Sequence, residues 1–253
     1  MGKYFQVEVK PTVPNVAAGQ HAAFGDNDLV FDWFAFDMPK GTSRLMSANI
    51  EIRPKGDSGS TVNEFDVDLL FAKTHNGVAP PSIGTVNSAA FASAVNLSNH
   101  MVHTFGSGDW DAHEAHLDST AWARTKTNIT QSGFAHFTGE PDSGTNVGYD
   151  RFYVAGIAAG ALDFRSETLI NNGDLNGPVM TVSGTDPRLF MSIGDTVNVT
   201  TTADTAVSKD MGVIKSMTGT SITLESAFTT GDVVHQDIVY NTAPIRIILH
   251  FEK

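Results

Sequence analysis

The heptapeptide FDVDLLF, residues 65–71, decides the fold class of this chain. Its side chains alternate with a period of two, so that Phe65, Val67, Leu69 and Phe71 are separated by Asp66, Asp68 and Leu70. Successive side chains of a β-strand point to opposite faces. Carboxylates at every second position are stable only where that face meets solvent. The stretch therefore predicts an antiparallel strand with one buried and one solvated face.

The same alternation recurs at residues 5–9, 50–52 and 245–251. Pro244 directly precedes the last of these stretches, at a position where the strand needs no backbone N–H donor. We expect further strands at residues 29–36, 101–105, 151–157, 164–170 and 188–200. Turns rich in Gly, Asn and Asp separate the strands, at residues 25–28, 54–57, 75–77 and 171–174. Many short strands between such turns indicate an all-β sandwich or barrel.

The composition changes near Asn176, and from there to Ala243 the chain has few aromatic residues and many Thr, Val, Gly and Asp residues. Its short strand candidates, at residues 193–197, 212–214, 221–224 and 231–234, suit an SH3-like barrel of about five strands. We expect a jelly-roll-like sandwich formed by residues 1–175 and 244–253, whose last strand pairs beside the first. The barrel at residues 176–243 is then an insertion. Two Ala-rich stretches, 88–97 and 112–123, are expected as short helices that decorate loops.

The bulk composition narrows the possible partners. Among 253 residues there are 16 Lys and Arg against 28 Asp and Glu, and the net charge of -12 repels phosphate backbones and anionic headgroups. We therefore expect neither nucleic acid nor membrane as a partner. The absence of cysteine excludes disulfides, thiolate metal sites and cysteine nucleophiles. The N-terminal stretch MGKYFQVEVK lacks the apolar run of a signal peptide, and no apolar run reaches the ~20 residues of a membrane helix.

The pentapeptide GDSGS at residues 56–60 matches the nucleophile loop of chymotrypsin-like proteases. Such an enzyme needs a base and an orienting acid upstream, in a barrel larger than the 55 preceding residues can form. We interpret the motif as a Gly/Ser turn between two strands, and we expect no enzymatic activity.

A stretch rich in His and Asp, residues 100–118, is the main candidate for a metal site. His113 and His116 would share one face of a helix, and Asp111 would add an oxygen ligand. The stretch matches neither HExxH nor an EF-hand. We interpret it as a solvated loop or a subunit-contact surface, and we expect no metal and no cofactor. Acidic turns at residues 26–28 and 142–150 suit Ca²⁺ as well as turn capping.

The aromatic run at residues 31–36 has apolar side chains on both faces. This predicts a strand that is buried in the sandwich on one face and covered by a loop or a neighbouring subunit on the other. The competing interpretation is a carbohydrate-stacking platform, in which Trp33, Trp110 and Trp122 provide contact rings.

The segment at residues 182–190, followed by Gly194-Asp195 and by residues 220–224, resembles virion structural proteins of tailed phages, especially marine and cyanophage-like ones. The resemblance covers about the C-terminal third of the chain, lies in composition and turn rhythm, and transfers no functional residue. It implies a capsid decoration or cement protein with a jelly-roll or related β fold.

That resemblance further implies a homotrimer that contacts the major capsid protein or another virion protein, is made in the host cytoplasm and lies on the capsid surface. Long connections at residues 74–99 and 106–149 agree with this, because we expect such loops to be ordered by a neighbouring copy. The alternative is a tail, baseplate or receptor-binding protein that binds carbohydrate, because these components share the same composition.

Overall fold

The computed structural model of the chain describes residues 2–13, 23–57, 67–106, 111–113, 124–128, 135–140, 148–171, 177–200, 208–228 and 233–253. Within these residues the secondary structure is antiparallel strand, apart from one 3₁₀ turn at Pro187–Leu189. The prediction of an all-β chain is confirmed.

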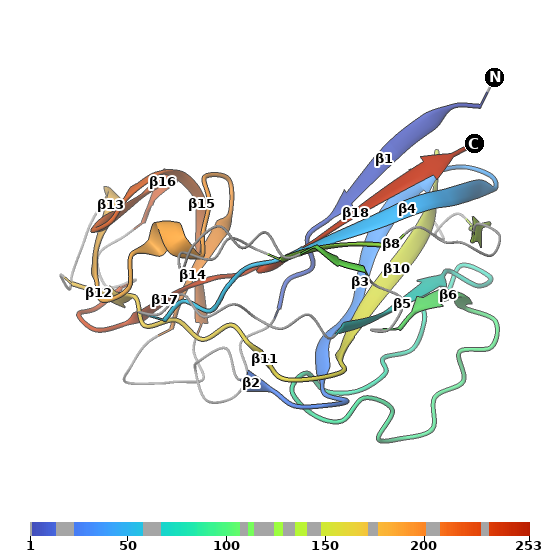
Figure 1. Cartoon of the computed structure of the whole chain (residues 1–253), viewed down its shortest axis with the longest axis horizontal. Coiled ribbons are helices and arrows are strands. Elements are labelled where there is room, and N and C mark those ends of the chain that lie inside the picture. Colours follow the sequence, from blue (N-terminus) through green and yellow to red (C-terminus); the bar gives the residue numbers. More distant parts are fainter. Residues whose placement is uncertain are drawn as a thin grey trace.

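Two sheets face each other in the larger lobe (Figure 1). The first sheet has the order β1 (Tyr4–Val9), β18 (Ile245–Glu252), β4 (Ser43–Ile52), β8 (Arg124–Asn128) and β7 (Asp111–His113), with β9 (His136–Phe137) also paired to β4. The second sheet has the order β3 (Leu29–Pro39), β10 (Tyr149–Ala158), β5 (Val67–Lys73) and β6 (Met101–Phe105). A two-stranded pair of β2 (Ala23–Phe24) and β11 (Leu162–Asp163) lies beside them.

The strand order is that of a jelly roll. Eight described strands of the sandwich have five or more residues. When they are numbered along the chain as β1, β3, β4, β5, β6, β8, β10 and β18, the two sheets have the orders 1-8-3-6 and 2-7-4-5. This is the double-sheet arrangement in which a long antiparallel ribbon wraps into a sandwich. The first and last strands pair in register, with Phe5 opposite Phe251 and Val7 opposite Leu249. The predicted sandwich and its returning terminal strand are confirmed.

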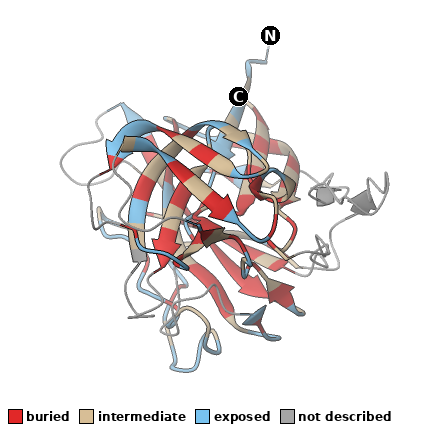
Figure 2. Ribbon diagram, turned by 90° about the vertical axis from the view of Figure 1, so that its left-hand side faces the viewer, coloured by how far each residue is buried: buried red, intermediate tan, exposed pale blue. Residues whose placement is uncertain are grey.

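The smaller lobe is a closed barrel with the order β12 (Leu169–Ile170), β13 (Gly177–Ser183), β16 (Ser221–Phe228), β15 (Ser208–Thr218), β14 (Thr196–Thr200) and β17 (Ile238–Asn241). It has its own core, which includes Met180, Val197, Ile214, Ile222 and Val239. Figure 2 shows buried and exposed residues alternating along these strands. The barrel lies between β11 and β18 in the chain, and its first strand precedes the expected boundary at Asn176.

The outer face of the second sheet is covered by the connection at residues 74–100. Leu70 and Ala155 of the sheet form a buried cluster with Ile83 and Leu97 of the connection. The indole N–H of Trp33 donates to the carbonyl of Pro81 at 2.8 Å. The predicted cover over the aromatic strand is confirmed, and it is a loop of the same chain. The prediction that one face of residues 65–71 is solvated is wrong at Leu70. This side chain is 7% exposed because the loop covers it.

Several strand predictions were too long. Of residues 164–170 only Leu169–Ile170 form a strand, and of residues 188–200 only Thr196–Thr200 do. Asp186 caps the 3₁₀ turn by accepting from the N–H of Arg188 at 3.0 Å, and Gly194 has a left-handed φ of +90°, so the chain turns twice before β14 begins.

Local turns also overrule two other predictions. Val233 and Val234 lie in a turn because Asp237 accepts from the N–H of Val234 at 2.8 Å. Residues 88–97 form turns and bends rather than a helix, and Phe91 has a positive φ of 56°. Of the second Ala-rich stretch, residues 112 and 113 belong to β7 and residues 114–123 lie outside the described residues.

Candidate functional site

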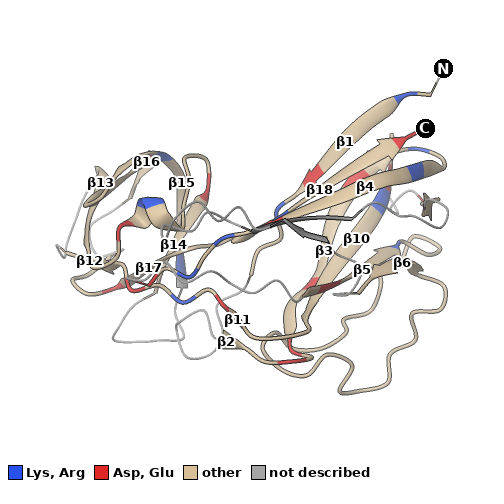
Figure 3. Ribbon diagram, viewed as in Figure 1, with Lys and Arg blue, Asp and Glu red and all other residues tan. Residues whose placement is uncertain are grey.

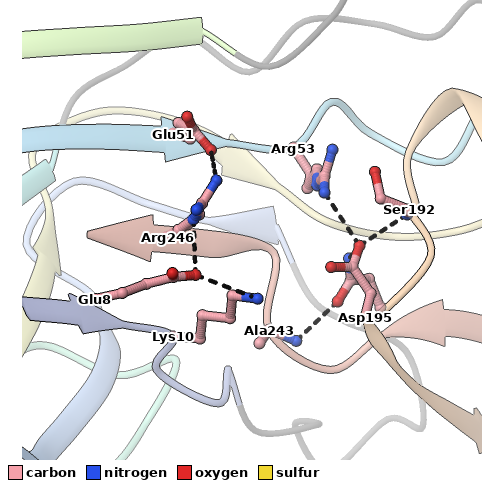
Figure 4. A network of polar contacts seen from close by, with 9 residues as sticks. Glu8, Lys10, Glu51, Arg53, Ser192, Asp195, Ala243 and Arg246 are labelled. Atoms are coloured by element: carbon pink, nitrogen blue, oxygen red, sulfur yellow. Dashed lines mark hydrogen bonds and ion pairs between the residues drawn. The ribbon is translucent and has the colours of Figure 1, made fainter. Parts of the chain in front are cut away.

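The most developed polar cluster lies where the barrel meets the first sheet of the sandwich (Figure 4). Arg246 of β18 stands opposite Glu51 of β4 in the strand register. Its guanidinium donates to Glu51 Oε2 at 3.1 Å and to Glu8 Oε1 of β1 at 2.8 Å. Lys10 Nζ lies 3.3 Å from the same Glu8 oxygen. Alternation directs these side chains to the outer face of three neighbouring strands.

The charges in this row stabilise one another. The hydrogen bond from Arg246 holds the pKa of Glu8 below its usual value, with smaller contributions from Lys10. In return, the hydrogen bond to Glu8 raises the pKa of Arg246. Both groups therefore stay ionised over a wide pH range.

Asp195 connects this row to the barrel. Its Oδ2 atom accepts from the backbone N–H of Ser192 at 2.9 Å, from Asn241 Nδ2 at 2.9 Å and from Arg53 Nη2 at 3.2 Å. Ser192 and Asn241 belong to the barrel lobe, whereas Arg53 directly follows β4 of the sandwich. Asn241 in turn accepts from the N–H of Ala243, which leads into β18. A single carboxylate oxygen thus joins the two lobes.

A cavity of about 420 Å³ lies at this junction and is lined by Lys10, Glu51, Arg53, Ser192, Asp195 and Arg246, among others. Its size is in the range of small-molecule sites. Figure 3 shows basic and acidic residues interspersed along the strands of both lobes. Because each of these cations is paired with a carboxylate, the geometry favours a brace between the lobes over an anion-binding pocket.

A second set of contacts joins the residues after β4 to the segment that leads into the barrel. The N–H of Gly56 donates to the carbonyl of Arg165 at 3.1 Å, and the N–H of Glu167 donates to the carbonyl of Gly56 at 2.6 Å. A Cβ atom at Gly56 would lie 3.1 Å from the ring of Phe190, so the close approach favours glycine. Lys55 lies between Asp57 and Asp163, at 3.5 and 3.3 Å.

These contacts give the start of the GDSGS motif a structural role. Gly56, together with Lys55, attaches the end of β4 to the segment that leads into the barrel. Asp57 pairs with Lys55, and residues 58–60 lie outside the described residues.

The His-rich stretch divides into separate environments. His100 Nδ1 lies 3.0 Å from the carbonyl oxygen of Lys73, and the ring of His103 packs edge-on against Phe105 at 4.5 Å. Asp111 and His113 belong to the short strand β7, so the helix expected to align His113 with His116 does not begin there. His116 lies outside the described residues. Where the structure describes the chain, it brings together no group of three or more His, Asp or Glu side chains suited to a metal ion.

The acidic turn at residues 26–28 is held by capping. Asp28 Oδ2 accepts from the N–H of Gly25 at 2.7 Å, and Asp26 accepts from the amide of Asn27 at 2.9 Å. At the end of the other candidate calcium segment, Asp150 is buried and accepts from the N–H of Gly41 at 2.9 Å. These contacts are those of turn capping.

The carbohydrate platform can be examined only at Trp33. This side chain is half-buried, packs against the cluster under the 74–100 loop and uses its N–H for Pro81. Trp110 and Trp122 lie outside the described residues.

Reasoning from sequence identified the solvated rows that carry Glu8, Glu51 and Arg246, but missed the junction. The signal was the charge at alternate positions of three predicted strands. The sequence does not show which strands pair, or in which register, so it could not place residues 8, 51 and 246 side by side. Asp195 was placed in the strand expected at residues 193–197 and was given no role in a site.

Comparisons with protein-family models, curated proteins and solved structures find no match to this chain. Among the described residues, no helix has the length and apolar character needed to span a bilayer.

Proposed function

We propose that the chain is a non-enzymatic virion structural protein, and that it is a capsid decoration protein which stabilises the shell through contacts between its copies and with the major capsid protein. The observation that supports this best is the built junction. Asp195, Arg53 and Gly56 join a jelly-roll sandwich and a barrel, each with its own core, into one body. A body of two joined lobes suits a protein that presents surface.

The state of the carboxylates agrees with a structural role. The pKa of Glu8 and the pKa of Asp186 lie below their usual values because of hydrogen bonds from Arg246 and Arg188. Burial alone would raise the pKa of Asp163, but hydrogen bonds from Arg165 outweigh it and lower that pKa as well. A general acid needs the opposite shift. Carboxylates held ionised by arginines are typical of ion pairs that fix geometry.

The surface favours protein partners. Large apolar side chains are exposed on both lobes, at Tyr4, Val78, Phe91, Tyr149, Val179, Ile193 and Val234. Aromatic and aliphatic side chains of this kind form the cores of protein interfaces. The net charge of -12 disfavours phosphate-rich partners. The proposed partners are therefore other copies of the chain and a shell protein.

The test is immunogold labelling of purified phage particles whose genome encodes this chain, with antibodies raised against the purified protein. We expect gold over the capsid surface, and antibody absorbed with the purified protein is the control. Label confined to the tail or baseplate would replace the decoration role with the alternative function. The absence of label from every purified particle would overturn the proposal of a virion protein.

Glycan binding tests the receptor-binding alternative directly. A glycan array probed with the purified protein is expected to stay blank. Binding that is lost on Trp110→Ala but kept on Phe91→Ala would favour the carbohydrate-binding role over decoration.

A further inference from the structure

β1 is an edge strand, and within the described part of the chain no strand pairs with its outer side. Among the described residues it pairs only with β18, and Figure 1 shows it as the outermost strand of its sheet. Lys3 and Lys253 exchange both backbone hydrogen bonds, at 3.2 and 2.9 Å. Hydrogen-bonded pairs alternate along an antiparallel ladder. Odd-numbered residues of β1 therefore bond to β18, whereas Tyr4, Gln6 and Glu8 direct their backbone N–H and C=O groups to the open edge.

The sandwich core is incomplete along the same edge. Phe5 and Val7 are only partly buried, although Phe251 and Leu249 beside them are 1% and 0% exposed. In the facing sheet, the edge strand β3 carries Phe34, which is also only partly buried. A further strand beside β1 would complete the burial of these side chains.

An apolar hollow adjoins this edge. It has a volume of about 350 Å³ and is lined in part by Tyr4, Phe5, Met46 and Phe251. Tyr4 itself is 72% exposed. Exposed apolar surface next to unpaired backbone groups is the usual template for strand addition.

We propose that a second copy of this chain adds its own β1 to this edge, antiparallel, about a two-fold axis that passes through Val7. In this register Gln6 faces Glu8 of the second copy, so an amide donor meets a carboxylate. Tyr4 faces Lys10 of the second copy, so an aromatic ring meets a cation. Gln6 and Glu8 supply the hydrogen-bonded pairs, as their open backbone groups require, and the inner row of Phe5 and Val7 becomes continuous across the axis.

The sequence disfavours the neighbouring registers. An axis at Glu8 places two carboxylates directly opposite each other, which destabilises a sheet. An axis at Val9 would pair residues 5–8 with residues 10–13, which lie beyond the end of β1 at Val9. An axis at Gln6 leaves Lys10 beyond the pairing and places Lys3 against Val9. The register centred on Val7 is the one that matches charge, backbone and apolar rows together.

This inference rests on the proposed function only in requiring self-assembly. A two-fold contact is isologous and gives even-numbered assemblies. We therefore expect dimers, or a hexamer built from them, in place of the isolated trimer that the phage resemblance implies.

Single cysteines test the register, because the natural chain has none. At a non-hydrogen-bonded position on the axis the two Cα atoms lie about 4.5 Å apart, which a disulfide can span. Val7→Cys is expected to give a covalent dimer on mild oxidation. Gln6→Cys and Glu8→Cys should each link poorly alone but link to each other when mixed. Thr104→Cys, exposed on the edge strand β6, is the control for random collision.

A proline tests the edge without cysteine chemistry. Gln6→Pro removes an N–H that faces the open edge and keeps the bonds to β18. Light scattering should report a monomer with an unchanged circular dichroism spectrum, whereas Val7→Pro should disturb the fold itself. The inference would be overturned if Gln6→Pro formed assemblies of the same molar mass as the wild-type protein. Equal crosslinking of Val7→Cys and Thr104→Cys would also overturn it.

The two proposals fail separately. The β1 contact would be refuted if the wild-type protein were a trimer and Val7→Cys formed no covalent dimer. Gold label on the capsid would still support the decoration role in that case. A β1 dimer whose antibodies label no particle would retain the contact and refute the virion role.

Discussion

The sandwich and the barrel fill their cores with different side chains. Among the described residues, nine of the 25 buried residues in the main sandwich cluster are phenylalanine, whereas the 14 in the barrel cluster include two phenylalanines and three methionines. Facing sheets lie about 10 Å apart and need long rings to fill the gap. The interior of a small barrel is narrower and suits branched aliphatic side chains and methionine.

The two lobes also differ at their edges. The barrel closes on itself, so each of its six strands has two neighbours. On one side the sandwich ends in the edge strands β1 and β3, where Phe5, Val7 and Phe34 are only partly buried. Among the described strands, the closed barrel has no unpaired edge, whereas the sandwich has an unpaired edge at β1, where we propose that a second copy pairs. This contrast predicts which substitutions affect the fold, the junction and the surface.

The largest effect is expected in the aromatic core. Phe71 is 0% exposed and its ring contacts those of Phe36, Phe105 and Phe137 at centroid distances of 6.4, 5.9 and 5.5 Å. Phe71→Ala removes these contacts and leaves a cavity, so the free energy of unfolding should fall by about 3–5 kcal/mol. Denaturant titration followed by circular dichroism measures this.

The matched control for that experiment is Phe91→Ala, because Phe91 is 41% exposed. Its effect should stay within about 0.5 kcal/mol. A loss below about 1 kcal/mol for Phe71→Ala would mean that the ring cluster does not support the sandwich.

A smaller effect is expected at the junction. Asp195→Ala deprives Arg53, Asn241 and the Ser192 N–H of one shared acceptor, and each is part-buried. The free energy of unfolding should fall by about 1–3 kcal/mol. Hydrogen exchange should become faster at residues 53–57 and 241–243 while the barrel core stays protected.

Asp210→Ala is the control for the junction, because Asp210 accepts only from Gly212 within the barrel in the contacts described. It should leave exchange at residues 53–57 unchanged. Equal exchange in both variants would contradict the role of Asp195 in joining the lobes.

The same contrast explains what sequence could predict. Alternation in residues 65–71, 5–9 and 245–251 revealed the sandwich strands because each places apolar groups on one face. The bounds of the barrel strands were predicted less accurately, because Asp186 and Asp237 form local turns within or beside the apolar runs. Propensity alone does not register such side-chain caps.

The candidate site was harder to predict for a different reason. Glu8, Glu51 and Arg246 meet only because three strands, far apart in sequence, share one register. The cover over the second sheet was predicted as a loop or a neighbouring subunit, and the structure decides for the loop through Ile83 and Leu97. Contacts within the chain therefore attach residues 74–100 to the second sheet, and the expected contact of this loop with a neighbouring copy stays a prediction.

The smallest effect is expected on the solvated row, at the ion pair of Glu8 and Arg246. Arg246→Met should cost about 0.5–1 kcal/mol at pH 7, because the pair is partly exposed and screened by water. The pKa of Glu8 is lowered from 4.5 in the folded state, so this contribution is present above pH 4.5 and is lost as the pH falls through the folded value. Unfolding titrations of both proteins from pH 7 to pH 3 should converge at the acidic end, and added salt should narrow their difference at pH 7. A gap that persists in acid would assign the effect of Arg246 to the packing of its aliphatic stem instead of its charge.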